Sequence, residues 1–296
     1  MNTSSPRLSD YALLTGLAII FGSSFMFTSI AVQELSPVVL AWLRVFIALL
    51  ILYPLMWMAG EHLPKSGRLW LFIVASALFG NAIPFWLIGW GQIKVEAGLT
   101  AIFMAIMPLT TIVLAQFFTQ DEKLNRWKVC GVLFGLAGVI VLMGWDALRS
   151  IGDDTLRQLA ILLAAVCYAI NAIITKQLLS VPKKSMIAAL MLSSVLLLLP
   201  WLLIEAPWSV RPSATAIGAV VMLAIGPTAI ATLLILVIID RQGASFLSQI
   251  NFMVPVFGVL FGTVFLAERL SPNAYIALVL ILVGVALSRW GNQREN

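Results

Sequence analysis

Ten long apolar segments constrain the fold of this chain more than any other feature of its sequence. A helix that crosses a lipid bilayer needs about 20 predominantly apolar residues. Segments of that kind cover roughly residues 11–32, 37–59, 69–90, 98–119, 127–145, 158–178, 185–205, 213–238, 244–267 and 273–290. Charged residues make up only 10% of the chain, whereas a typical soluble domain carries about 25%. The sequence therefore predicts an all-α, polytopic membrane protein with ten transmembrane helices.

The distribution of Lys and Arg predicts which way the chain crosses the membrane. With the N-terminus inside the cell, the inner segments contain twelve of these residues and the outer segments five, with Arg44 set aside because it lies within a span. Cytoplasmic loops of membrane proteins carry an excess of Lys and Arg. We therefore expect a protein of the plasma (bacterial inner) membrane with both termini in the cytoplasm. Because the basic residues are spread over many loops, a nucleic-acid-binding patch is not expected.

The second half of the chain repeats the first. Residues of the less common types recur 146 positions apart: Glu122 and Glu268, Gly138 and Gly284, Pro54 and Pro200, and Gly80 and Gly226. Such matches indicate an internal repeat, and we assign its copies to residues 1–146 and 147–296. Each copy contains five spans, an odd number, so the second copy crosses the membrane in the opposite sense. An inverted repeat is typical of secondary transporters, which bind substrate near the midplane between the copies.

Short motifs in both copies resemble those of a known transporter family. They are Leu40-Ala41-Trp42-Leu43-Arg44 in the second span, Pro108 with Glu122-Lys123-Leu124, Gly131 and Gly138, and the second set Pro255, Glu268-Arg269-Leu270 and Gly284. With these motifs the chain resembles, over nearly its whole length, two tandem EamA-type units of the drug/metabolite transporter (DMT) superfamily. The resemblance implies ten helices around a central cavity lined by helices 1, 3, 4, 6, 8 and 9, and export of metabolites. Within the family, the functional likeness is to YddG-type amino-acid exporters.

Polar, aromatic and methionine side chains within the spans are the candidates for binding substrate. A polar side chain in lipid is costly, so such residues should face protein or a water-filled path. The candidates are Ser24, Asn81, Phe85, Thr100, Met104, Met107, Tyr168, Asn171, Thr228, Thr232 and Gln249. They fall on spans 1, 3, 4, 6, 8 and 9, which the repeat relates in three pairs. Each has a structural alternative, because hydroxyls bond their own helix and Met and aromatic side chains pack between helices.

A second group of residues is expected to shape the helices. Arg44 lies inside the second span, where it either anchors a substrate carboxylate or is satisfied by backbone carbonyls, and we favour the structural role. Glu122 and Glu268 lie at span ends and are expected to end or anchor helices. Prolines inside spans should kink them and act as hinges; these are Pro84, Pro108, Pro227 and Pro255. Two glycine pairs with GxxxG spacing predict close helix contacts within the chain: Gly131 with Gly135, and Gly258 with Gly262.

The residue types argue against catalysis. The single histidine, His62, lies in a predicted loop, and the sequence contains no HExxH motif, no glycine-rich phosphate loop and no Cys/His cluster. The two cysteines, Cys130 and Cys167, fall inside apolar spans and are interpreted as small buried hydrophobes. We therefore expect no enzyme activity, no cofactor and no bound metal.

The charged residues also restrict the chemical class of the substrate. Spans 1 and 6 contain no acidic residue, which argues against a carrier of lipophilic cations, and too few basic residues lie near the spans to hold a pyrophosphate. The sequence predicts a secondary transporter that exports small neutral or zwitterionic metabolites by alternating access, most of all amino acids, including aromatic and other apolar ones. A multidrug or organic-cation exporter of the same superfamily is the alternative, followed by a channel. The expected partners are a small-molecule substrate and the lipid bilayer, with a monomer as the functional unit.

Overall fold

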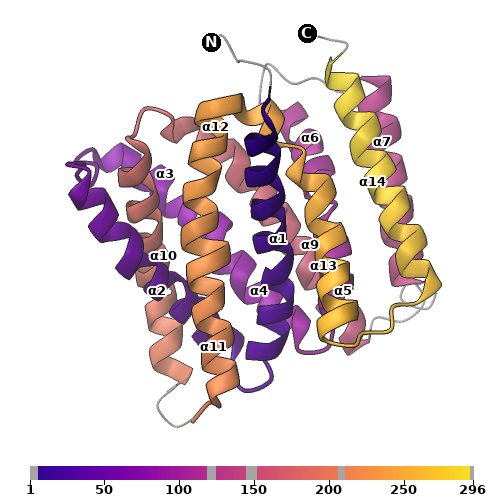
Figure 1. The fold of residues 1–296 in the computed structure, drawn as a ribbon, viewed down its shortest axis with the longest axis horizontal. Helices are drawn as coiled ribbons and strands as arrows, with labels where there is room; N and C mark the ends of the chain where they lie inside the picture. The colour runs from indigo at the N-terminus through magenta and orange to yellow at the C-terminus, as the bar shows by residue number, and fades with distance from the viewer. Residues whose placement is uncertain (1–5, 119–124, 145–151, 206–210, 294–296) are drawn as a thin grey trace.

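The helices of this protein run side by side between two faces of the molecule (Figure 1). The computed structural model describes residues 6–118, 125–144, 152–205 and 211–293, and within these residues it contains helices and no strands. The first described helix begins and the last described helix ends at the same face (Figure 1). We call it the terminal face, and the other end of the helices the opposite face.

Ten helical crossings make up the described chain, which confirms the predicted architecture. In the first copy they are α1 (Leu8–Ala31), α2 (Pro37–Met58), α3 (Gly67–Ala77) continued by the π-helical segment η1 (Leu78–Ala82) and α4 (Ile83–Gln92), α5 (Ala97–Met104) continued by α6 (Met107–Phe118), and α7 (Arg126–Met143). In the second copy they are α9 (Asp153–Thr175) with the 3-10 turn η2 (Lys176–Leu178), α10 (Lys183–Glu205), α11 (Ala214–Leu223) continued by the π-helical segment η4 (Ala224–Ile230) and α12 (Ala231–Leu247), α13 (Ile250–Phe265) and α14 (Pro272–Gln293). Among these crossings, nine are long and apolar enough to span a membrane, and α13 is shorter.

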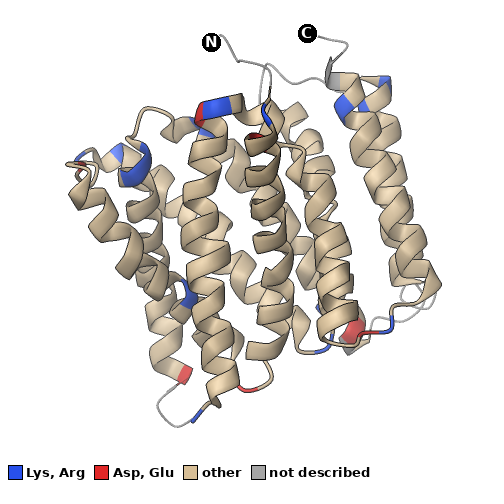
Figure 2. Cartoon of the chain, in the orientation of Figure 1, with Lys and Arg blue, Asp and Glu red and all other residues tan. Residues whose placement is uncertain are grey.

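The outer surface of the helix bundle suits lipid. Figure 2 shows the charged residues concentrated near the two faces of the molecule, with few between them in the described helices. Large apolar side chains such as Leu50, Leu133, Leu163 and Leu196 are exposed on the outside. Exposed apolar surface of this extent is rare in a soluble monomer. The protein is therefore a multi-pass membrane protein.

The third and eighth crossings are interrupted at equivalent positions of the repeat. Each contains a π-helical segment, and the two segments begin at Leu78 and Ala224, which are 146 residues apart. Pro84 is the second residue of α4, directly after η1, and Pro227 lies within η4. Proline has no backbone N–H and cannot close the helical bond to residue i−4. The interruptions thus lie at or beside prolines to which the sequence assigns kinks.

The fourth crossing is interrupted near its middle. Ala105 and Ile106 separate α5 from α6, and Pro108 is the second residue of α6. Pro108 has no backbone N–H group. The helical hydrogen bond from residue 108 to the carbonyl oxygen of Met104, the last residue of α5, therefore cannot form. The two half-helices α5 and α6 therefore meet inside the bundle.

The ninth crossing differs from the sequence prediction. The hydropathy places its start at residue 244 and a kink at Pro255, but α13 begins at Ile250 and runs through Pro255 without an interruption. Gly243, whose φ of 81° and ψ of 172° are not helical, kinks the chain within α12, so that residues 244–247 form a short separate helical stretch before α13. Glycine adopts this conformation at no steric cost. The connection to α13 is then made at Ser248 and Gln249.

Glycines bring the fifth and tenth crossings into backbone contact. A Cβ atom added to Gly131 would lie 2.4 Å from the carbonyl oxygen of Gly284, and one added to Gly284 would lie 2.5 Å from the carbonyl oxygen of Gly131. Near the terminal face, Asn125 Nδ2 donates to the carbonyl oxygen of Gly291 at 3.0 Å. Small residues permit this close approach of two membrane helices. The contact lies within one chain and joins the two copies.

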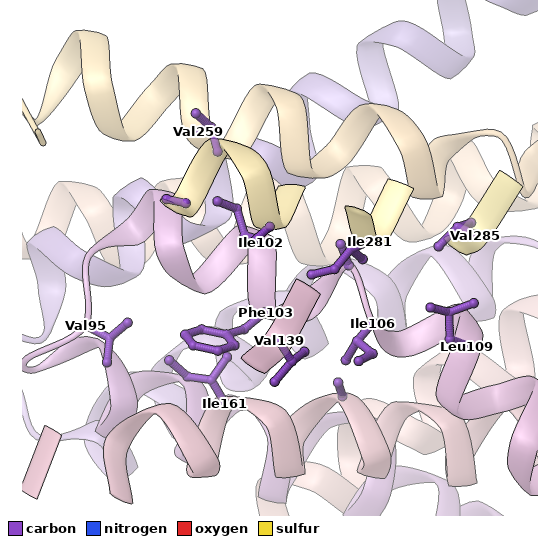
Figure 3. Close-up of a cluster of buried hydrophobic side chains, with 14 residues drawn as sticks. Val95, Ile102, Phe103, Ile106, Leu109, Val139, Ile161, Val259, Ile281 and Val285 are labelled. Carbon is purple, nitrogen blue, oxygen red and sulfur yellow. The ribbon is translucent and has the colours of Figure 1, made fainter. Parts of the chain in front are cut away.

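A buried apolar cluster also joins the copies (Figure 3). The fourth crossing contributes Ile102, Phe103, Ile106 and Leu109, which meet Val139 of α7, Ile161 of α9, Val259 of α13, and Ile281 and Val285 of α14. In a membrane, packing rather than exclusion of water drives helix association. Interlocking side chains of this kind therefore fix the position of the fourth crossing against the second copy.

Candidate functional site

A cavity of about 420 Å³ lies between the two copies. Small-molecule sites have volumes of about 300–1,000 Å³, so this cavity has the size of one. Its lining comes from α1, α2, η1, α4, α5, α6, α9, α10, η4, α12 and α13. This set includes the six crossings that the family resemblance implies and adds α2 and α10.

Most of the predicted substrate-binding residues line this cavity. They are Ser24, Asn81, Phe85, Met104, Met107, Tyr168, Thr228 and Thr232. Pro108, Pro227 and Pro255 also reach its wall. Irregular membrane helices occur where they line a cavity or are buried in protein. The interrupted crossings and the cavity thus belong to the same region of the molecule.

Three predicted residues lie outside the lining. Thr100 is fully buried and its Oγ1 donates to the carbonyl oxygen of Glu96 at 2.9 Å, which is the own-helix bond named as the structural alternative. Asn171 bonds another crossing, since its Oδ1 accepts from Ser76 Oγ at 2.5 Å. Gln249 lies in the turn between α12 and α13.

Sequence reasoning missed several lining residues. Met191 lines the cavity from α10, and Arg44, for which the sequence favours a structural role, lines it from α2; both helices lie outside the predicted set of crossings. Asn251 lines it from α13, two residues beyond Gln249. Its amide within an apolar span was a signal that could have found it. Met191 stands in a largely apolar run, so the sequence offers no signal for that position.

The hydroxyls in the wall are oriented by bonds to their own helices. Ser24 Oγ donates to the carbonyl oxygen of Phe21 at 2.6 Å, and Thr232 Oγ1 donates to that of Thr228 at 2.5 Å. A hydroxyl that donates its hydrogen in this way keeps lone pairs that accept a further hydrogen bond. These two side chains therefore offer the cavity acceptors.

Asn81 is held by a serine of the seventh crossing. Its Nδ2 donates to Ser194 Oγ at 3.0 Å, and Ser194 Oγ donates to the carbonyl oxygen of Leu190 at 2.7 Å. Ser194 is fully buried. A buried amide needs several hydrogen-bond partners, and this chain of bonds supplies one of them while Asn81 lines the cavity.

Arg44 contributes a positive charge to the cavity wall. Its Nε donates to Thr228 Oγ1 at 2.8 Å, and its guanidinium carbon lies 3.8 Å from the centroid of the Phe85 ring. Thr228 Oγ1 in turn donates at 2.9 Å to the carbonyl oxygen of Leu223, five residues back, within the widened helix at η4. Among the lining residues that the structure describes there is no Asp or Glu.

On the side of the cavity toward the opposite face, α1, α5 and α13 are in close contact. A Cβ atom added to Gly258 would lie 2.3 Å from the Cβ of Ala101, and one added to Gly22 would lie 3.0 Å from the backbone nitrogen of Gly258. Since Ala101 is itself a lining residue, this contact borders the cavity. Toward the terminal face, the lining continues to Ile235 and to Ile250, the first residue of α13.

Glu268 joins the segment after α13 to the start of α5 on this side of the cavity. Its Oε1 accepts from the backbone N–H of Ala97 at 2.6 Å and its Oε2 from that of Gly98 at 2.9 Å. These are the first residues of α5, and the first N–H groups of a helix have no partner within it, so a carboxylate is favourable there. A Cβ atom at Gly262 would lie 2.1 Å from Oε2. Its repeat counterpart, Glu122, lies outside the described residues.

A second carboxylate near Glu268 is expected to make stability depend on pH. The pKa of Glu96 is raised by burial first and by repulsion from Glu268 second. Ionisation of Glu96 is thus less favourable in the folded protein than in the unfolded chain, and stability falls as the pH rises through its folded-state pKa. Glu96→Gln is expected to raise the melting temperature at neutral pH and to leave it unchanged at acidic pH. Thermal unfolding in detergent across this pH range measures the difference.

Glu34, in the connection between α1 and α2, provides a control of opposite sign. Its pKa is lowered by hydrogen bonds from Ser213, the side-chain bond first and the backbone bond second. Glu34→Gln is therefore expected to lower the melting temperature at neutral pH, with a difference that vanishes as the pH falls through the folded-state pKa. If the melting temperatures of Glu96→Gln and Glu34→Gln changed with pH in the same way, the opposite pKa shifts assigned to the two carboxylates would be wrong.

Comparison with known proteins gives the relatives of this chain. The model of the EamA-like transporter family matches it twice, over residues 9–144 and 156–290. The chain is 23% identical to the uncharacterised transporter YoaV of Bacillus subtilis (strain 168), over 95% of this chain and 97% of the relative. It is 24% identical to the uncharacterised inner membrane transporter YedA of Escherichia coli (strain K12), over 95% and 90%. It is also 24% identical to a protein of that strain named "Probable amino-acid metabolite efflux pump", over 95% of each chain.

A solved structure has the same fold. A crystal structure described only as that of a protein superposes with a TM-score of 0.70 and 22% identity, over 98% of this chain and 100% of the other. The two matches to the family model together cover most of the sequence, one in each half. The chain therefore belongs to the EamA-like transporter family, within the DMT superfamily.

Proposed function

We propose that this protein exports small metabolites, most of all amino acids, across the bacterial inner membrane by alternating access. One observation carries the proposal: the cavity lies between the copies, with α1, α5 and α13 in close contact on its side toward the opposite face and its lining reaching Ile250 toward the terminal face. Two copies of opposite orientation can exchange conformations, which gives a second state that is open at the other face. A transporter must populate both states, and it does so when their free energies are close.

Orientation and assembly follow from the same features. The excess of Lys and Arg in the segments at the terminal face supports cytoplasmic termini. On this orientation the lining at Ile250 lies toward the cytoplasm, where an exporter loads its substrate. Because one chain supplies the cavity wall, we propose that a monomer is the functional unit.

The cavity wall supports a substrate with an apolar body and a few polar groups. Phe21, Phe25, Phe85 and three methionines offer apolar and aromatic surface, while hydroxyls and amides offer hydrogen bonds. A volume of about 420 Å³ accommodates a large amino acid. The lack of a carboxylate among the described lining residues argues against an organic-cation carrier. The efflux pump named above is a relative whose name refers to amino-acid metabolites.

Counterflow in proteoliposomes tests the proposal. Vesicles loaded with unlabelled Met, Thr or Phe are expected to take up the labelled amino acid only when they contain the protein. Met191→Trp places a larger side chain in the cavity wall, where overpacking costs about 1–3 kcal/mol, and should slow counterflow by about tenfold or more. Leu196→Trp, on the exposed side of the same helix, is the matched control and should retain the wild-type rate. Flux of an organic cation without flux of any amino acid would overturn the proposal.

A further inference from the structure

We infer that Arg44 binds the carboxylate of the substrate, and that a carboxylate rather than an amine is the group the cavity selects. This inference rests on the proposed transport of small metabolites and assigns the chemical class of the substrate. It departs from the structural role that the sequence suggests for Arg44. Three features of the cavity support it: the unmatched charge of the guanidinium, its fixed orientation, and the kind of polar groups that lie around it.

The charge of Arg44 has no carboxylate partner among the described residues. Its polar contact is the single bond from Nε to Thr228 Oγ1, and its flat face lies over the ring of Phe85. Both partners are neutral. A charged side chain within a membrane-spanning segment is costly, and such residues face a cavity or pair with an opposite charge. Arg44 lines the cavity, so a bound anion would supply the missing opposite charge.

The guanidinium is oriented before any substrate arrives. Thr228 Oγ1 donates to the carbonyl oxygen of Leu223, so one of its lone pairs accepts from Arg44 Nε. Stacking on Phe85 fixes the plane of the group. The terminal N–H groups, which make no hydrogen bond to a described residue, remain as donors. Two parallel donors in a fixed plane match the two oxygens of a carboxylate.

The remaining polar groups suit an amine without requiring one. Ser24 and Thr232 use their hydrogens on backbone carbonyls and present lone pairs to the cavity. Such acceptors bind an ammonium group, but they carry no charge. A substrate thus gains its charge interaction from its carboxylate, while its amine makes neutral contacts. The favoured class is therefore monocarboxylates with an apolar body, which includes the amino acids.

Competition for labelled phenylalanine in proteoliposome counterflow tests the inference. Phenylalanine and N-acetylphenylalanine, which both carry the carboxylate, are expected to compete within about tenfold of each other. Phenylalaninamide, which lacks the carboxylate, is expected to compete at least about tenfold more weakly than phenylalanine. Arg44→Gln should weaken competition by phenylalanine about 10- to 100-fold and abolish the preference for acid over amide. Arg44→Lys, which keeps the charge but not the planar pair of donors, should restore part of that preference.

Arg157 provides a matched control outside the cavity. Its guanidinium carbon lies 4.1 Å from the centroid of the Trp90 ring, and Nη1 donates to the carbonyl oxygen of Trp90 at 2.7 Å. Arg157→Gln removes the same charge and the same kind of stacking, so it should keep the wild-type preference for acid over amide. That preference is the ratio of the competition by two compounds on one preparation, so it does not depend on the fraction of protein that folds.

The outcomes separate the inference from the proposed function. Equal competition by phenylalanine and phenylalaninamide in the wild-type protein would overturn the role of Arg44 and leave amino-acid transport standing. An unchanged preference in Arg44→Gln would do the same. If neither Arg44 variant folds, the competition series on the wild-type protein alone decides, since equal competition by acid and amide sinks the inference. Absence of any phenylalanine flux in the wild type would instead sink the proposed substrate.

Discussion

Glu268→Ala is expected to open the cavity to the opposite face. The Glu268 carboxylate accepts hydrogen bonds from the first two N–H groups of α5, and hydrogen bonds to charged groups contribute about 1.5–3 kcal/mol each when buried. Because Glu268 is half-buried, we expect a total loss of about 2–3 kcal/mol from the closed state. This corresponds to an increase of about 30- to 150-fold in the ratio of open to closed molecules.

Cysteine labelling measures this shift. In a background of Cys130→Ser and Cys167→Ser, the substitution Met104→Cys places a thiol in the cavity wall. A membrane-impermeant maleimide applied at the opposite face should label it slowly in otherwise unchanged protein and faster by the factor above in Glu268→Ala. Glu34→Ala removes a carboxylate that bonds Ser213, at the α1–α2 connection rather than at α5, and should leave the labelling rate unchanged.

A second substitution tests the same contact without touching the carboxylate. An added Cβ at Gly262 would lie 2.1 Å from Glu268 Oε2 and 2.9 Å from the backbone nitrogen of Gly98. Gly262→Ala should therefore displace the carboxylate from α5 and accelerate labelling as Glu268→Ala does. Glu268→Gln keeps one acceptor oxygen but not the charge, so its labelling rate should lie between that of otherwise unchanged protein and that of Glu268→Ala. Labelling at the wild-type rate in both Gly262→Ala and Glu268→Ala would show that this contact does not hold the cavity closed.

Hydropathy predicts where the chain crosses the membrane, but it does not predict which residues of each helix face the cavity. The ten apolar segments reappear as ten crossings because a span must be long and apolar whatever packs against it. Which side of a helix faces the cavity depends on where that helix is interrupted. The kink at Gly243 and the turn at Ser248 and Gln249 both precede α13, which begins at Ile250. As a result, the sequence selects Gln249, while Asn251 is the residue that lines the cavity.

Polar residues in spans are ambiguous for a different reason. Thr100 and Asn171 satisfy their hydrogen bonds with Glu96 and Ser76, and nothing in their own sequence neighbourhood separates them from Thr232, which lines the cavity. Their partners lie on the same or another helix, so only the packed structure distinguishes them. The position of Arg44 is similar, because its partners Thr228 and Phe85 lie on crossings far away in the sequence.

Gly284→Leu is expected to destabilise the protein by forcing α7 and α14 apart. An added Cβ at Gly284 would lie 2.5 Å from the carbonyl oxygen of Gly131 and 3.0 Å from the backbone nitrogen of Gly135. These are backbone atoms, so no side-chain rotation relieves the clash. Overpacking costs about 1–3 kcal/mol or more, and each kcal/mol lowers the melting temperature by about 2–4 °C in a chain of roughly this size. We expect a decrease of about 5–10 °C in thermal unfolding measured in detergent.

Gly218→Leu is the matched control for this substitution, because nothing lies within 4 Å of an added Cβ at Gly218 in α11. It should unfold near the wild-type temperature, since leucine also has the higher helix propensity. Neither α7 nor α14 contributes a described residue to the cavity lining, so Gly284→Leu that is kept folded at low temperature should retain the wild-type preference among substrates. A melting temperature within about 2 °C of the wild type would mean that the two helices separate without cost, and their glycine contact would then not be what joins the copies.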